Sequence, residues 1–195
     1  MLFRSTDEML AEHTRQGRST AFAALVARHC HTVYRIARNV CASAADAEEV
    51  TRQTFLSAYH GAHSRPSGPS VKTWLCGIAM KKASVQRQRA WRSQSVSLEA
   101  FLPRFDAEGG LEPPGAEWPE LGSARAEQMN VAGFLRKALD DMDEGVRAAF
   151  VLCELAELPA EDAAAIVEAT PEVVRRRVHR ARLMLRGLLD RLWSL

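Results

Sequence analysis

The residues best suited to bind a charged partner are seven arginines between Pro171 and Leu192, a stretch whose acids are Glu172 and Asp190. Guanidinium groups bind phosphates and the edges of nucleic-acid bases. A face that serves only solubility usually mixes acids with bases, whereas this stretch has a net charge of +5. The composition therefore favours contact with a polyanion over a merely solvated helix face.

A helix must position these arginines. Thr170 can cap its N-terminus with a hydroxyl, and Pro171 suits the first helical position. Apolar residues then recur at steps of four and three, which places them on one face. This stripe consists of Val174, Val178, Ala181, Leu185, Leu188 and Leu192. Most of the arginines fall outside the stripe, so we expect an amphipathic helix with an arginine face.

A shorter helix is expected just before it, over residues 160–169, with a small apolar face that includes Ala163 and Ala164. The turn Glu168-Ala169-Thr170 separates the two helices. A compact helix, a short turn and a longer basic helix form the pattern of a helix-turn-helix, whose second helix enters the DNA major groove. The turn lacks the usual glycine, so the arginine face is the stronger part of this argument.

The position of each arginine along the helix predicts its role. The N-terminal turns of such a helix meet base edges, so we expect Arg175 and Arg176 to read bases. Arg180 and Arg182 lie further along and are expected to be nearer the phosphates. Arg177 is closer to the apolar stripe, which suggests a bridge to the preceding helix.

A second basic block, residues 71–92, has six lysines or arginines, no acid, and two tryptophans, Trp74 and Trp91. Cations combined with exposed aromatic rings bind single-stranded nucleic acid, because an unstacked base can lie against a ring. The candidate contacts are Trp74, Lys81, Lys82, Arg87 and Arg89. For Trp74, which Leu75 and Ile78 flank, a place in the core is the favoured alternative.

Helical periodicity extends over most of the chain, and no strand pattern occurs. Further helices are expected at 7–15, from Ser19 to about 40, from the capping box at Ser43 to about His60, at 71–92, at 131–141 and at 145–156. Residues 93–130 are rich in proline, glycine and acids. The predicted fold is all-α, with two small helical domains, 1–92 and 131–195, joined by an irregular acidic linker, 93–130.

Other classes of function are poorly supported. The sequence has no glycine-rich phosphate loop, no HExxH and no nucleophile elbow, so we expect neither an enzyme nor a cofactor. The four cysteines form no CxxC pair, so no metal site is expected. The chain opens without a signal peptide and has no apolar run of about 18 residues, which indicates a cytoplasmic protein.

Several stretches, in this order, carry a resemblance to a known family. They are Ala21–His29 with Val33–Arg38, Asp46–Leu56, Thr73–Ala79 and Val174–Arg182. Together they resemble the bacterial RNA polymerase sigma factors of the extracytoplasmic function (ECF) group, within the sigma-70 family. The resemblance implies two helical domains, resembling sigma regions 2 and 4, that direct promoter recognition, DNA melting and transcription initiation.

The resemblance also implies partners and contact residues. The first domain would bind the clamp helices of the largest subunit of core RNA polymerase, through Asp46, Glu48, Glu49, Arg52, Gln53 and Phe55. The basic block 71–92 would contact the downstream promoter element. The last helix would contact the upstream element, through Glu172, Val173, Arg175, Arg176, Arg177, His179, Arg180 and Arg182. An anti-sigma factor, of the membrane-linked kind common in this group, would hold the protein inactive; no small-molecule substrate is implied.

The chain departs from the family pattern at informative positions. In the polymerase-binding stretch Glu49 stands for an Asp, Arg52 for a Gln and Gln53 for a Glu. A cation replaces a neutral side chain and an acid is lost on a face meant for a basic coiled coil. The alternative function is therefore a sigma-like DNA- or partner-binding regulator with weakened polymerase docking. Glu172, Val173 and Arg176 also depart from the pattern, which predicts an unusual upstream element.

Overall fold

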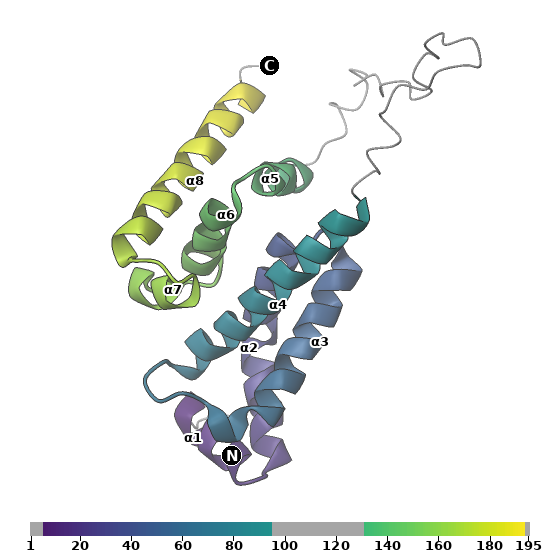
Figure 1. The fold of residues 1–195 in the computed structure, drawn as a ribbon, viewed down its shortest axis with the longest axis vertical. Helices are drawn as coiled ribbons and strands as arrows, with labels where there is room; N and C mark the ends of the chain where they lie inside the picture. Colours follow the sequence, from purple (N-terminus) through teal and green to yellow (C-terminus); the bar gives the residue numbers. More distant parts are fainter. Residues whose placement is uncertain (1–5, 95–130, 194–195) are drawn as a thin grey trace, which may run out of the picture.

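The computed structural model describes residues 6–94 and 131–193, which contain helices and no strand (Figure 1). The first lobe comprises α1 (Asp7–Arg15), α2 (Ser19–Val40), α3 (Ala44–His60), the short η2 (Ala62–Ser64) and α4 (Val71–Gln94). The second lobe comprises α5 (Val131–Asp140), α6 (Glu144–Phe150), the π-helical η5 (Val151–Leu155), α7 (Ala160–Ile166) and α8 (Pro171–Trp193). The predicted all-α fold is confirmed, while most of the predicted linker lies outside the described residues.

Local capping explains where several helices begin. Ser43 Oγ accepts a hydrogen bond from the Asp46 amide at 3.0 Å, and the Ser43 hydroxyl donates to the Asp46 carboxylate at 2.6 Å. The Thr170 hydroxyl accepts from the Val173 amide at 3.4 Å, as its position before Pro171 predicted. Asp143 caps α6 in the same way, accepting from the Gly145 amide at 2.9 Å.

The turn between α7 and α8 forms without glycine. α7 ends at Ile166, earlier than the predicted 169, and Glu168 adopts a left-handed backbone with φ of 50°. A side chain other than glycine pays a steric cost in this conformation. The chain therefore reverses direction between α7 and α8 through a residue that gave no turn signal in the sequence.

The two lobes pack against each other over a shared core. One continuous cluster of buried side chains includes Ile36 of α2 and Cys76 of α4 from the first lobe, and Leu152 of η5 and Ala163 of α7 from the second. Helix α2 contacts η5, and α4 contacts α7 (Figure 1). At one point of closest approach, a β-carbon on Gly77 would lie 3.6 Å from Ile166 Cγ1. The lobes thus form a closed arrangement, a point that the sequence left open.

Candidate nucleic-acid and polymerase interface

Helix α8 presents the arginine face that the sequence predicted. Val174, Val178 and Ala181 are buried against the rest of the second lobe, where α6 and α7 contact α8. The opposite side of the helix is exposed and carries Arg175, Arg176, His179, Arg180 and Arg182, together with Glu172. Val173 lies half-buried in the first turn. The candidate upstream-element residues therefore share one helix whose apolar face fixes its orientation.

Two of these arginines are paired with acids of neighbouring elements. Arg175 forms an ion pair with Glu161 of α7 and lies 3.7 Å from the Glu172 carboxylate. Arg182 donates a hydrogen bond to Glu154 of η5 at 2.7 Å. Sequence reasoning missed both Glu154 and Glu161, because no sequence period relates them to α8. In this arrangement the guanidinium groups of Arg175 and Arg182 are both engaged by carboxylates of the second lobe.

The half-buried Arg177 packs on α6, while the bridge to the preceding helix stays a prediction. A β-carbon on Gly145 of α6 would lie only 2.9 Å from Arg177 Cζ. The guanidinium therefore occupies the space that the absence of a side chain at Gly145 leaves open. Arg177 helps to seat α8 on α6, which makes it a positioning residue in the closed form.

Removing the two acids should raise the affinity for non-specific DNA. With glutamine at Glu154 and Glu161, two negative charges beside α8 disappear and both paired arginines become available to phosphates. We expect binding to a non-specific duplex to tighten by about three- to tenfold, with a salt dependence steeper by about one to two units. Fluorescence anisotropy across a salt series measures both. An unchanged slope would place Arg175 and Arg182 outside the DNA contact surface.

The candidate downstream-element residues separate into different environments. Lys81, Lys82 and Arg89 line an open groove between α3 and α4, together with Glu49 and Gln53 of the candidate polymerase-binding set. The groove is thus cationic on its α4 side. It brings the candidate DNA and polymerase contacts of the first lobe next to each other.

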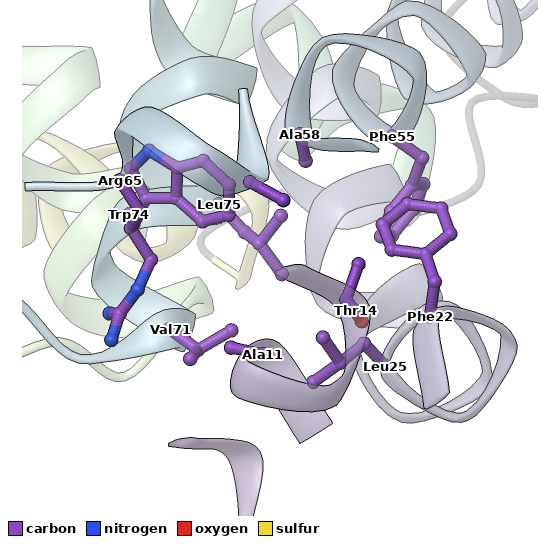
Figure 2. Close-up of a pocket in the computed structure, with 11 residues that line it drawn as sticks. Ala11, Thr14, Phe22, Leu25, Phe55, Ala58, Arg65, Val71, Trp74 and Leu75 are labelled. Atoms are coloured by element: carbon purple, nitrogen blue, oxygen red, sulfur yellow. The ribbon is translucent and has the colours of Figure 1, made fainter. Parts of the chain in front are cut away.

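Trp74 lines a small cavity beneath the 61–70 segment, in keeping with the core alternative (Figure 2). Figure 2 shows Trp74 and Arg65 on one side of this cavity and Phe22 and Phe55 on the other. Its volume is about 10 Å³, at the lower limit of what one water molecule needs. The half-buried Trp74 therefore supports the segment above it and offers little ring surface for stacking on a base.

Arg87 faces the second lobe. Its guanidinium donates to the carboxylate of Asp140, the last residue of α5, at 2.7 Å and to the Asp140 carbonyl at 3.2 Å. It also donates to the carbonyl of Val40, the last residue of α2, at 3.1 Å. In the closed arrangement the guanidinium of Arg87, a predicted DNA contact, is therefore hydrogen-bonded to acceptors of the protein itself.

The candidate polymerase-binding set lies on α3. Glu48, Glu49 and Arg52 are exposed, and Arg52 donates two hydrogen bonds to Glu49, at 2.6 and 2.8 Å. Together with Gln53, which donates at 2.8 Å, Arg52 holds the pKa of Glu49 down to about 2. Glu49 therefore stays ionised, but its charge is largely satisfied within α3.

Asp46 and Phe55 differ from the exposed members of this set. Asp46 is half-buried and accepts a hydrogen bond from Gln86 of α4 at 2.6 Å. Phe55 is only 8% exposed and meets Phe22 edge-on, with ring centroids 6.4 Å apart. Its ring belongs to the core and leaves little surface for the predicted contact with polymerase. Leu56, which the sequence analysis did not select, is 41% exposed and is the apolar residue beside Arg52 on the outer face.

The described residues contain neither a candidate metal cluster nor a candidate membrane span. No group of three or more His, Cys, Asp or Glu side chains in residues 6–94 and 131–193 is arranged to hold a metal ion. Within the same ranges, none of the helices combines the length and hydrophobicity that a bilayer span requires.

Comparison with known proteins gives consistent matches over both lobes. Residues 25–95 match the family Sigma-70 region 2, and residues 135–185 match Sigma-70, region 4. The sequence is 30% identical over 187 residues to RNA polymerase sigma factor CnrH of Cupriavidus metallidurans, covering 94% of each chain. It is also 30% identical over 185 residues to the ECF RNA polymerase sigma-E factor of Escherichia coli, covering 91% of each.

Two solved structures share the fold. One is CnrH in complex with the cytosolic domain of CnrY, with a TM-score of 0.68 and 24% identity, covering 94% of this chain and 97% of that one. The other is the sigma factor RpoE in complex with the anti-sigma factor NepR from Bartonella quintana, with a TM-score of 0.62 and 25% identity. That match covers 87% of this chain and 96% of the other.

Proposed function

Because this chain belongs to the ECF group of the sigma-70 family of RNA polymerase sigma factors, we propose that its two lobes divide promoter recognition between them. The first domain, 1–92, binds core polymerase and opens the downstream element, and the second, 131–195, reads the upstream element. The observation that carries this division is the exposed arginine face of α8, which lies within the region 4 match. The protein acts as a transcription initiation factor without chemistry of its own.

An anti-sigma factor is part of this proposal. RpoE was solved in complex with the anti-sigma factor NepR, and CnrH in complex with the cytosolic domain of CnrY. In this chain the two lobes already share a core, and Arg87 is turned toward the second lobe. A partner that binds across both lobes would hold this closed arrangement and keep Arg87 away from DNA.

One observation favours the second candidate, a sigma-like regulator with weak polymerase docking. Glu49, one of the two exposed acids of the docking face, accepts two hydrogen bonds from Arg52 on its own helix. A basic coiled coil that approaches this face meets a carboxylate that is already neutralised, with a cation beside it. Leu56, exposed next to this pair, offers apolar contact that compensates in part.

In vitro transcription with purified core polymerase separates the two candidates. We expect the full chain to co-elute with core and to give a run-off product from the DNA upstream of its own operon. The matched variant Arg52→Gln removes the cation that pairs with the Glu49 carboxylate, so it should bind core more tightly. The gain should be only about two- to threefold, because an exposed ion pair contributes little free energy. Absence of a run-off product from either protein would reject initiation and leave the regulator.

A further inference from the structure

Arg87 joins the C-terminal ends of two helices that belong to different lobes. Its Nη1 donates to the Val40 carbonyl at the end of α2 and to Asp140 Oδ1, and its Nη2 donates to the Asp140 carbonyl at the end of α5. The Arg87 side chain is only 21% exposed. Within α4, Arg87 thus hydrogen-bonds to the second lobe through both of its terminal nitrogens.

Physical chemistry favours a guanidinium at this place. The last carbonyls of a helix have no partner within the helix and carry the negative end of its dipole. An arginine has five N–H donors in a fixed fork, so it can serve two helix ends and a carboxylate at once. A lysine, with a single ammonium group, fits such a three-point site less well.

Arg147 of α6 donates to the same Asp140 carbonyl that accepts from Arg87. The Arg147 side chain is 5% exposed, and its Nη1 donates to the Leu139 carbonyl at 3.2 Å and to the Asp140 carbonyl at 3.4 Å. Burial, with the nearby charge of Arg87, lowers the pKa of Arg147. Asp140 thus stands between two guanidinium groups, and its charge is what allows them to lie so close.

We propose that Arg87 is a switch residue with two alternative ligands: the end of α5 in the closed form, and a phosphate of promoter DNA in the open form. One guanidinium cannot bind both, so lobe closure and DNA binding compete. Lys81, Lys82 and Arg89 lie away from Asp140, along the α3–α4 groove, and can attract DNA before the lobes part. This inference rests on the proposed DNA-binding function of the first lobe and adds a means of regulating it.

A second set of links must also break when the lobes part, which limits what Arg87 alone can do. Thr73, at the start of α4, donates a hydrogen bond to Asp162 of α7 at 2.7 Å. Between the two polar links, α4 passes close to α7: a β-carbon on Gly77 would lie 3.6 Å from Ile166 Cγ1. Loss of the Arg87 link should therefore shift the closed population toward the open one without unfolding either lobe.

The test uses the full chain with a fluorophore in each lobe, placed through unnatural amino acids at the exposed residues Ala42 and Ala165. Energy transfer reports lobe separation, and anisotropy reports binding of a labelled single-stranded oligonucleotide. Asp140→Asn keeps Arg87 but removes its carboxylate ligand, and it leaves two guanidinium groups facing each other. We expect lower energy transfer and oligonucleotide binding about three- to tenfold tighter, since the binding-competent fraction rises.

Two matched variants give the decisive comparison. Arg87→Ala should lower energy transfer as Asp140→Asn does, yet its oligonucleotide affinity should not exceed that of the unmodified chain. Arg89→Ala should leave energy transfer unchanged and weaken binding about two- to fivefold. If Asp140→Asn does not fold, the unmodified chain must still lose energy transfer as oligonucleotide is added, and Arg87→Ala must respond less.

The competition would be overturned if energy transfer stayed constant on addition of oligonucleotide, or if Asp140→Asn opened the lobes without tighter binding. Absence of oligonucleotide binding by every variant would overturn it too. These measurements contain no polymerase, so a failure of the switch can be told apart from a failure of transcription initiation. A failed run-off assay with an intact switch would reject initiation and leave the coupling in place.

Discussion

Replacing Arg176 with alanine is expected to reduce the preference for the chain's own upstream element by about 5- to 100-fold. Arg176 is exposed in the second turn of α8, where a recognition helix meets base edges. The neighbouring arginines already contact other parts of the second lobe: Arg175 is paired with Glu161, and Arg177 packs on Gly145. A bidentate arginine contact with a guanine edge discriminates by about 1–3 kcal/mol, which sets the expected range.

A promoter library transcribed with core polymerase measures this preference. The matched control is Arg180→Ala, one turn further along the same exposed face. We expect Arg180→Ala to weaken binding to all sequences alike, with a salt slope shallower by about one unit, as for a phosphate contact. If Arg176→Ala also weakened every sequence equally, Arg176 would contact phosphate, and the reading of bases would pass to Arg175 or His179.

The helices and their caps follow from local sequence, which is why they could be predicted. Ser43 and Thr170 cap helices because their hydroxyls reach amides three residues ahead, a geometry that needs no tertiary structure. The apolar stripe of α8 likewise depends only on spacing. Of the predicted stripe, Val174, Val178 and Ala181 are buried and Leu185 is half-buried, while the side chains of Leu188 and Leu192 lie outside the described residues.

The contacts that change the candidate site depend on packing between distant segments. The Arg87–Asp140 hydrogen bond joins residues 53 positions apart, and the Arg182–Glu154 bond spans 28 positions. Neither pair shares a period or a motif. Phe55 shows a different limit: it lies beside the buried Thr54, and spacing alone could not decide which of the two faces the core. Thr54 and Phe55 are both buried, and Leu56 is the exposed apolar residue beside Arg52.

Replacing Arg147 with alanine is expected to lower the free energy of unfolding by about 2–4 kcal/mol, the largest stability effect that we expect from a polar residue of this chain. The loss has two parts. The Leu139 and Asp140 carbonyls lose a buried donor, and the truncated side chain leaves a cavity between α5 and α6. For a chain of this length the midpoint of thermal unfolding should fall by about 5–15 °C.

Arg147→Met separates these parts, because methionine fills most of the volume and donates no hydrogen bond. If packing dominates, Arg147→Met should melt close to the unmodified chain, since a well-packed apolar residue can replace a buried charge at no cost. If the hydrogen bonds to the carbonyls dominate, Arg147→Met should have a melting temperature close to that of Arg147→Ala. We expect the second result, because the Leu139 carbonyl accepts from Arg147 where the guanidinium is almost fully buried. Equal melting of Arg147→Met and the unmodified chain would instead mean that Arg147 adds little stability through its hydrogen bonds.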